Sequence, residues 1–413
     1  MELLQWISKA IAVLFFLCYF YQFLYIPISW RKEKERPSQS RCNHYAVLIC
    51  ARNEEAVIGD LLDSIHTQTY PDTLIHPFVM ADNCTDETAA VAAVHGAKVY
   101  IRENKTLVGK GYALEALLEA IQADYPGGFD GYFVFDADNI LNPDYIEHMH
   151  ETFTQGYEIV TSYRNSKNFA DNWISAGYAL WFLRESQYLN RARMKLGTSC
   201  AVSGTGFLFS RKILDELGGW PFHLLTEDIE FSIHEILEGR TIGYCENAVF
   251  YDEQPTNFRQ SWRQRTRWSK GYLQVLGKYG AGLIRSIFRG RFSAFDMSMN
   301  IMPAFILTAA GLLVEASILI LSFQHGGVTA ALPSLLRIFG SMYGTLFILG
   351  AITTATEWTR IRATAANKIR AVLTFPIFMF TYLPIAICAV FAKAEWKPII
   401  HTVRAEDMHR KAA

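Results

Sequence analysis

The stretch GYFVFDADN, residues 131–139, decides the fold of this chain. Its first half is an apolar, aromatic run with the length and composition of a buried strand. Two carboxylates separated by one residue, Asp136 and Asp138, end the run. If the strand geometry persists, alternation puts both on one side, where they can share a hard cation with phosphate oxygens. A polar turn that caps the helix after Pro143 is the alternative, so other motifs must decide between the two.

Short apolar runs on the N-terminal side of this stretch alternate with helical patterns, which predicts a mostly parallel sheet wrapped by helices, the α/β class. Strands are expected at residues 45–50, 76–81 and 98–101, and a helix at 56–67. Ligands of open α/β sheets bind beyond the carboxyl ends of the strands. Arg52 and Asn53 follow the first of these strands, and Asp82 and Asn83 follow the second.

The amino-acid composition indicates that the chain also contains membrane segments. Of the 413 residues, 51% are hydrophobic and 19% are charged, which is apolar for a soluble enzyme. A net charge of −1 provides no field for nucleic acid, so no nucleic-acid partner is predicted. The seven cysteines lack C-x-x-C spacing, which argues against a disulfide framework or a zinc site.

Residues 10–30 form an uncharged stretch of about 20 residues, enough to cross a hydrocarbon layer of ~30 Å. A cleaved signal peptide is the competing interpretation, but the stretch lacks a small-residue cleavage site. Further spans are expected at residues 301–323, 338–356 and 371–392. Basic residues at 31–36 and in the link 358–370 place the intervening domain on the cytoplasmic side of the plasma membrane.

The sequence does not decide how the last apolar segment crosses the membrane or on which side the C-terminus lies. Counting four spans places the C-terminus outside, which disagrees with its mildly basic tail, and Pro376 and Pro384 would permit a re-entrant hairpin instead. Glu315 lies in mid-span, where a carboxylate is costly. Two interpretations are open. The side chain faces a protein interior or an aqueous path, or it makes a hydrogen bond between two helices.

We therefore divide the chain into four parts. They are an N-terminal transmembrane helix with a basic juxtamembrane segment (1–39), a catalytic domain (40–255), interfacial amphipathic helices (256–295) and C-terminal transmembrane helices with a tail (296–413). The third part alternates arginine with tryptophan, which is typical of a helix lying on an anionic leaflet.

Four motifs follow one another in order: Asp82, Asp136-Ala137-Asp138, Thr226-Glu227-Asp228, and Gln264-Arg265-Thr266-Arg267-Trp268. Each is weak alone, but in this order the chain resembles, over nearly its whole length, the family 2 glycosyltransferases with a GT-A fold. The resemblance is to the membrane-integrated branch that includes hyaluronan, chitin, cellulose and poly-N-acetylglucosamine synthases. Relatives often carry D-D-S or D-S-D where this chain has D-A-D-N, which leaves the donor sugar open.

The resemblance implies an inverting transfer from a UDP-sugar, with Asp228 as the catalytic base beside Glu227. It implies that Asp138, with Asp136, ligates Mg²⁺ or Mn²⁺ at the donor diphosphate. The implied donor-binding residues are Ala51, Arg52, Asn53, Glu54, Asp82, Lys110, Asp136, Gln264, Arg267 and Trp268. The implied acceptor-side residues are Gly204, Thr205, Gly206, Thr226 and Trp268.

Structural interpretations compete with some of these roles. Asp82 could cap a helix, and Thr226 could cap a helix whose positive N-terminus favours Glu227 and Asp228. The glycines of 203–206 could form a tight turn. Helical spacing makes core packing the expected role of Trp173, Tyr178 and Trp181.

The favoured function is the addition of a hexose or N-acetylhexosamine to a growing exopolysaccharide, coupled to secretion. One alternative is a single transfer to a membrane lipid, as in ceramide or diacylglycerol glucosyltransferases. A transporter or receptor with a nucleotide-sensing domain is the alternative outside enzymes. The expected partners are a UDP-sugar, a polysaccharide or lipid-linked acceptor and membrane lipids, and the sequence does not indicate whether a partner subunit is needed.

Overall fold

The computed structural model describes residues 2–32, 42–301, 303–393, 399 and 401–412, so residues 33–36 of the basic juxtamembrane segment lie outside it. The globular part is built on an eight-stranded sheet in the order β3-β2-β1-β4-β7-β6-β8-β5. The strands are β1 (Tyr45–Ala51), β2 (Ile75–Asp82), β3 (Lys98–Arg102), β4 (Gly131–Asp136), β5 (Ile140–Leu141), β6 (Ile159–Ser166), β7 (Phe207–Ser210) and β8 (Ile242–Asp252).

One half of the sheet is parallel, as predicted, because the apolar runs of β1 and β4 are buried on both faces. The other half mixes directions, with β7 antiparallel to both β4 and β6. The expected helix at 56–67 is α2 (Ile58–His66). The strand that begins at Gly131 ends at Asp136, so Asp138 follows in a turn and the expected strand alternation does not relate the two carboxylates.

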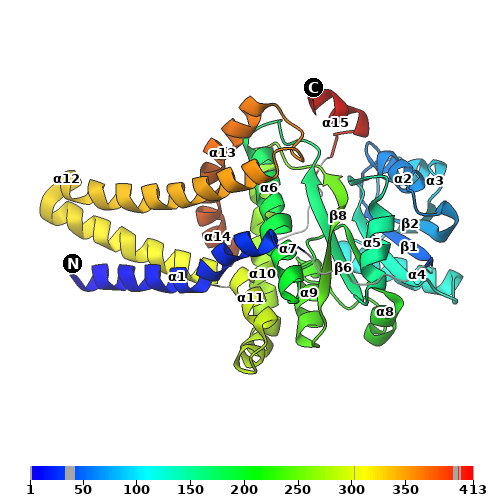
Figure 1. Cartoon of the computed structure of the whole chain (residues 1–413), viewed down its shortest axis with the longest axis horizontal. Coiled ribbons are helices and arrows are strands. Elements are labelled where there is room, and N and C mark those ends of the chain that lie inside the picture. The colour runs from blue at the N-terminus through cyan, green and yellow to red at the C-terminus, as the bar shows by residue number, and fades with distance from the viewer. Residues whose placement is uncertain (1, 33–41, 302, 394–398, 400, 413) are drawn as a thin grey trace.

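Helices cover the sheet (Figure 1). After α3 (Thr88–Val94), α4 (Lys110–Asp124) and α5 (Tyr145–Thr154) come α6 (Trp173–Arg184), α7 (Arg191–Leu196), α8 (Arg211–Leu217), α9 (Glu227–Leu237), α10 (Phe258–Phe288) and α11 (Phe292–Ile301). A π-helical turn, Glu185–Asn190, joins α6 to α7. Such turns often mark functional sites.

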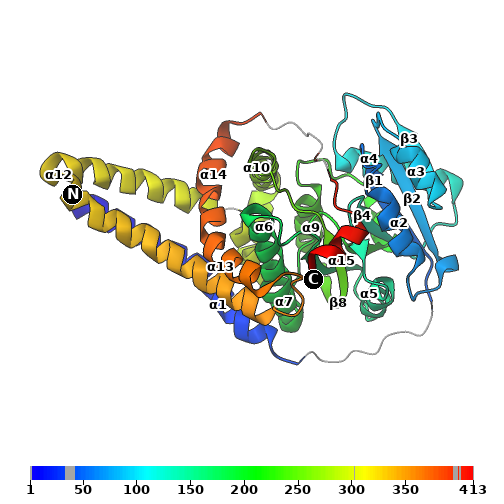
Figure 2. The same ribbon diagram turned by 90° about the horizontal axis from the view of Figure 1, so that it is seen from above.

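The apolar helices are α1 (Glu2–Ser29), α12 (Pro303–Thr356), α13 (Ala365–Phe380) and α14 (Tyr382–Phe391). Figures 1 and 2 show α1 and two arms of a bent α12 projecting together from the globular part. Among the described residues, three segments are long and apolar enough to cross a membrane: Glu2–Ser29, Phe339–Thr356 and Ala365–Phe391. The apolar helix in the region of the expected span 301–323 is shorter, Ala310–His325.

The last apolar run, for which the sequence permits either a span or a re-entrant hairpin, packs against the globular part. In both views α13 and α14 run across the base of the projecting arms, and α15 (Ala405–Ala412) returns to the globular part. A Cβ added to Gly177 of α6 would lie 2.3 Å from the Phe378 ring, so α13 packs directly on α6. This apolar run therefore packs partly on protein, and the side on which the C-terminus lies stays a prediction.

The first apolar helix is fastened to the rest of the molecule. Tyr21 and Tyr25 of α1 donate hydrogen bonds of 2.6 and 3.0 Å to Asp296 of α11. The carboxylate of Asp296 is fully buried and pairs with Arg193 of α7, Nε to Oδ2 2.7 Å. Glu315 accepts a hydrogen bond from Ser8 of α1, which confirms the interhelical alternative for that residue.

Candidate active site

A cavity of about 410 Å³ lies beyond the carboxyl ends of β1, β2 and β4, and α9, α10 and the C-terminal helices complete its wall. The four side chains expected to gather, Asp136, Asp138, Asp228 and Arg267, all line it. The other predicted site residues that line it are Ala51, Arg52, Glu54, Asp82, Lys110, Gly204, Thr226, Glu227, Gln264 and Trp268.

Three predicted site residues are not part of this lining and shape the walls instead. The Asn53 amide bonds to Thr85, with Thr85 N–H donating to Oδ1 at 2.8 Å. The Thr205 hydroxyl accepts a hydrogen bond of 2.9 Å from the backbone N–H of Asp136. Gly206 has φ +67°, and a Cβ there would lie 2.3 Å from the Phe250 ring, so only glycine fits.

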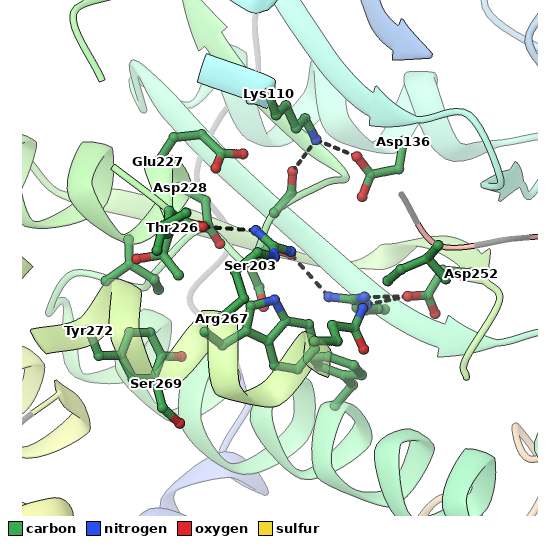
Figure 3. Close-up of a pocket in the computed structure, with 18 of the residues that line it drawn as sticks. Lys110, Asp136, Ser203, Thr226, Glu227, Asp228, Asp252, Arg267, Ser269 and Tyr272 are labelled. Carbon is green, nitrogen blue, oxygen red and sulfur yellow. Dashed lines mark hydrogen bonds and ion pairs between the residues drawn. The ribbon is translucent and has the colours of Figure 1, made fainter. Parts of the chain in front are cut away.

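The first carboxylate of the D-A-D sequence forms an ion pair (Figure 3). Lys110, the first residue of α4, pairs with Asp136 and also donates a hydrogen bond of 2.7 Å to the Gly204 carbonyl. Burial alone would lower the pKa of Lys110, but the charges of Asp136 and Glu227 more than offset it and raise that pKa. An ammonium group therefore stands in the cavity at neutral pH.

The second carboxylate is more deeply placed. Asp138 is 5% exposed, and its Oδ2 accepts a hydrogen bond of 2.7 Å from the Glu253 backbone N–H. Burial would raise its pKa, but His401, Lys167 and this hydrogen bond hold the pKa of Asp138 below its usual value. The group is therefore an anion facing the cavity.

The oxygen atoms around Asp138 suit a hard divalent cation. Asp252, at the end of β8, also lines the cavity, and its buried Oδ1 has no hydrogen-bond partner among the described residues. Within the described part of the chain, no three acidic, histidine or cysteine side chains come close enough to enclose a metal. A Mg²⁺ or Mn²⁺ ion held by Asp138 would complete its shell with phosphate oxygens and water, as Mg²⁺ commonly does.

Asp82 is fixed at the end of β2. Arg102 Nη1 donates to Asp82 Oδ1 at 2.5 Å and Asn83 Nδ2 donates at 2.9 Å. The following helix α3 has Glu87 at its N-cap, so Asp82 does not cap it. The carboxylate is held as an acceptor at the edge of the cavity.

The T-E-D motif opens α9. Thr226 occupies the N-cap position, but its buried hydroxyl makes no hydrogen bond among the described residues, so the proposed side-chain cap is absent. Burial, and next the charge of Asp228, raise the pKa of Glu227 to about 7. Burial also raises the pKa of Asp228, although nearby N–H groups and Lys110 oppose the change. Such carboxylates accept protons near neutral pH more readily than ordinary ones.

The Q-x-x-R-W motif lies on α10, against the T-E-D motif. Arg267 Nη1 donates to the Leu225 carbonyl at 2.8 Å, which holds the guanidinium beside Asp228 (Figure 3). The buried Oε1 of Gln264 has no hydrogen-bond partner among the described residues. Trp268 packs edge-on against Tyr178, with ring centroids 5.8 Å apart, and its side chain also borders the cavity.

Another part of the cavity wall comes from the C-terminal helices and combines polar with apolar side chains. It includes side chains from α11, α12, α13 and α14, namely Asn300, Thr308, Met379, Tyr382, Leu383 and Ala386. Trp181 and Phe182 of α6 also line it, whereas Tyr178 is buried in the core. The prediction of core packing is thus confirmed for Tyr178. It does not hold for Trp181, which lines the cavity. The cavity joins strand-end carboxylates to helices of the membrane region.

The sequence reasoning missed several charged residues of the wall: Arg164, Glu185, Asp252, Glu253 and His401. Asp252-Glu253 carries the same signal that revealed Asp136, because two carboxylates end a strand there. Glu185 lies in the π-helical turn, and its carboxylate makes no hydrogen bond or ion pair within the described residues. Nothing local in the sequence marks His401, which comes from the far end of the chain.

Comparisons with known proteins agree with this geometry. The β-monoglucosyldiacylglycerol synthase of Synechocystis sp. is 25% identical over 376 residues, 87% of this chain and 75% of that protein. The poly-β-1,6-N-acetyl-D-glucosamine synthase of Staphylococcus epidermidis is 27% identical over 237 residues, 55% of this chain and 54% of that protein. This chain thus spans about half the length of the second relative.

A solved mannosyltransferase from Pyrobaculum calidifontis, in complex with GDP-Man and Mn²⁺, has the same fold, with a TM-score of 0.62 at 16% identity. The match covers 95% of this chain and 100% of that one. The profile described as glycosyltransferase like family 2 matches residues 42–271, more than half of the sequence. The protein therefore belongs to glycosyltransferase-like family 2 and has the GT-A fold.

Proposed function

We propose that the protein transfers one sugar, with inversion, from a UDP-sugar to the hydroxyl group of a membrane lipid. The observation that carries this proposal is the continuous cavity between the strand-end carboxylates and the apolar wall of α13 and α14. The lipid acceptor takes the place of the growing polysaccharide that the motifs favoured.

The donor lies at the charged end. Asp82 accepts a hydrogen bond from the nucleoside, and Lys110 and Arg267 offset the charge of the diphosphate. A divalent cation held at Asp138 would stabilise the negative charge that builds on the leaving nucleoside diphosphate. The low exposure of this end strengthens these interactions.

The transfer itself needs one base. Asp228 takes the proton of the acceptor hydroxyl as its oxygen forms a bond to the anomeric carbon, on the face opposite the nucleotide. The bond from the anomeric carbon to the phosphate oxygen breaks, and its electron pair leaves with the nucleoside diphosphate. A single displacement of this kind inverts the configuration.

The apolar wall supports a lipid acceptor. With its hydroxyl at Asp228, a lipid would lay its hydrocarbon chains along Met379, Leu383 and Ala386, where burial of apolar surface contributes affinity. The similarity to a β-monoglucosyldiacylglycerol synthase, which matches over 87% of this chain, supports the same acceptor class.

Product analysis tests the proposal. The protein in lipid nanodiscs, with Mg²⁺ or Mn²⁺, is given UDP- and GDP-sugars together with diacylglycerol, monoglucosyldiacylglycerol, ceramide or oligosaccharides, and nucleotide release and product mass are measured. We expect a lipid carrying one added sugar and nucleotide release that depends on the lipid. Long polymers formed without added lipid would overturn the proposal in favour of chain synthesis. Absence of nucleotide release from folded protein with every donor and acceptor would overturn both.

We also propose that the catalytic domain lies on the cytoplasmic side of the plasma membrane. The link between α12 and α13 supports this orientation because it is basic and touches the domain, with Asn165 Nδ2 donating to the Arg360 carbonyl at 3.0 Å.

A further inference from the structure

The donor contacts and the proton transfer leave one carboxylate of the cavity wall without a role. Glu185 is the first residue of the π-helical turn, and it lines the cavity while being partly buried. Its carboxylate has no hydrogen-bond or ion-pair partner within the described residues. Such a group is costly, because burial removes the water that would solvate its charge. Burial accordingly raises the pKa of Glu185.

The arginines around Glu185 are already satisfied by other groups. The charges of Arg164, Arg193 and Arg184 all favour the ionised form of this carboxyl group. Arg164, however, pairs with the carboxylate at the end of β8, and Arg193 pairs with the buried carboxylate of α11. Arg184 Nη2 donates to a side-chain amide of α1 at 2.8 Å. Glu185 is therefore not needed as the counter-ion of any of the three.

The helix around Glu185 gives its neighbours different tasks. Arg184, just before it, reaches α1, and the hydroxyl of Ser186, just after it, accepts a hydrogen bond of 3.3 Å from the Arg164 backbone N–H. Trp181, one turn earlier on α6, lines the cavity together with Glu185. Residues four apart lie on one face of a helix, so this ring and this carboxylate border the same part of the cavity.

Glu185 lies near the proposed base, on the side of the aromatic residues of α10 and α14. Burial raises the pKa of Tyr272 on α10, and the charges of Glu185 and Asp228 raise it further, so both carboxylates lie close to this ring. Trp268 and Tyr382 belong to the same wall. An ionised carboxylate only accepts hydrogen bonds, and it repels a diphosphate. Its ligand is therefore a group that donates hydrogen bonds, such as a hydroxyl.

We propose that Glu185 determines acceptor specificity by accepting a hydrogen bond from a second hydroxyl of the acceptor, which is a lipid with a sugar or polyol headgroup. This inference rests on the proposed function. The first hydroxyl reacts at Asp228, and the second one, at Glu185, fixes the orientation of the headgroup. Diacylglycerol has a single hydroxyl and would leave Glu185 unpaired. A site built to bind a hydroxyl discriminates strongly against an analogue that lacks it.

Acceptor kinetics test the inference. The full-length protein in nanodiscs is given its preferred nucleotide-sugar with diacylglycerol, monoglucosyldiacylglycerol, phosphatidylglycerol or phosphatidylinositol, and then with deoxy analogues of the best acceptor. We expect a lipid with a sugar or polyol headgroup to be preferred over diacylglycerol. Loss of one hydroxyl other than the reacting one should lower kcat/KM for the lipid about 10–100-fold, as expected for a hydrogen bond to a charged group.

Variants of Glu185 identify the partner of that hydroxyl. Glu185→Ala should lower kcat/KM for the best acceptor by the same factor, and it should then use the deoxy analogue as well as the parent lipid, because the contact is already lost. Glu185→Gln keeps an accepting oxygen and should be intermediate. Calorimetry with UDP or GDP and Mn²⁺ should show unchanged nucleotide affinity. Glu119→Ala, which removes an exposed carboxylate of α4, is the matched control and should behave as wild type does.

Glycosylation of diacylglycerol as efficiently as of the other lipids would overturn the inference, and so would unchanged kcat/KM in folded Glu185→Ala. A higher KM for the donor alone would assign the carboxylate to the donor sugar and overturn it as well. Should Glu185→Ala fail to fold, the wild-type preference and Glu185→Gln decide the question. Failure of the proposed function looks different, because the wild-type protein would then form no glycolipid from any of these acceptors.

Discussion

Glu227 and Asp228 are adjacent carboxylates in a cavity that also contains Lys110 and Arg267. Burial raises the pKa of both acids, and each negative charge disfavours the other. Their protons therefore come off as a coupled pair, and the proposed base is poised to accept a proton close to neutral pH.

Replacing the base tests its role. Asp228→Asn keeps the shape of the side chain but removes its ability to accept a proton, so kcat should fall by about 10²–10⁴-fold. Nucleotide binding should persist, which calorimetry with UDP would show. Asp215→Asn on α8, where the side chain is 60% exposed, is the matched control and should be as active as wild type. A sensor or transporter would lose nothing on substitution of Asp228.

Removing the neighbouring acid should shift the pH profile. The rate needs ionised Asp228, so kcat/KM should fall as pH decreases through the raised pKa values of the pair, near pH 7 for Glu227. Glu227→Gln eliminates a negative charge beside Asp228 and so lowers the pKa of that base. The acid limb of the profile should then move to lower pH. An acid limb that stays in place would show that these two carboxylates do not titrate together.

Individual residues show why some roles were readable from the sequence. Asp136 and Asp138 stand at the end of an aromatic strand, and a carboxylate there is conspicuous against a buried run. Asp252-Glu253 stands in the same position after β8 but was not recognised, because no motif directed attention to it. His401 could not be found at all, since only the tertiary fold brings it to Glu54.

The packing of α6 against α13 links the catalytic domain to the membrane helices. Helical spacing in α6 indicated a buried face, yet the partner of that face, Phe378, could not be inferred from either segment alone. Arg265 of α10 reinforces the junction, with Nη1 donating to the Thr381 hydroxyl at 2.6 Å. Its side chain is fully buried against the rings of α6 and α13.

A single methyl group should test this junction. In Gly177→Ala the new Cβ would lie 2.3 Å from Phe378, so the unfolding free energy should decrease by about 1–3 kcal/mol through overpacking. The measurement is thermal unfolding of the protein in detergent. Gly127→Ala meets nothing within 4 Å and is the control. The double change Gly177→Ala with Phe378→Leu should recover part of the loss, and no recovery would place the damage elsewhere.

The arrangement of the membrane segments was the part least accessible from sequence. Hydropathy located the apolar runs well, since the expected span 338–356 corresponds to Phe339–Thr356. It cannot report whether a run faces lipid or protein, and part of Ala365–Phe391, including Phe375 and Phe378, is buried inside the protein. The order of the sheet was also only partly predictable, because antiparallel β7 inserts between β4 and β6.

Cysteine labelling should place the tail and the catalytic domain on one side. Two single-cysteine proteins are compared, one that keeps only the native Cys42 and one with a cysteine only in place of Arg404. Both positions are exposed and should react with an impermeant maleimide from the same side of sealed vesicles. A cysteine at Gln324, which is exposed near the end of the apolar helix Ala310–His325 in α12, should react from the other side. Labelling of positions 404 and 42 from opposite sides would contradict the fold of the C-terminal region.

The buried Asp296 carboxylate has a practical consequence for anyone who trims this protein to a soluble fragment. It is surrounded by Arg193 of α7 and by two tyrosine hydroxyls of α1, so deleting α1 leaves an under-solvated charge inside the truncated molecule. Such a fragment should therefore be less stable to unfolding than the full-length protein. The N-terminal helix, a candidate membrane span, is therefore also a structural component of the folded protein.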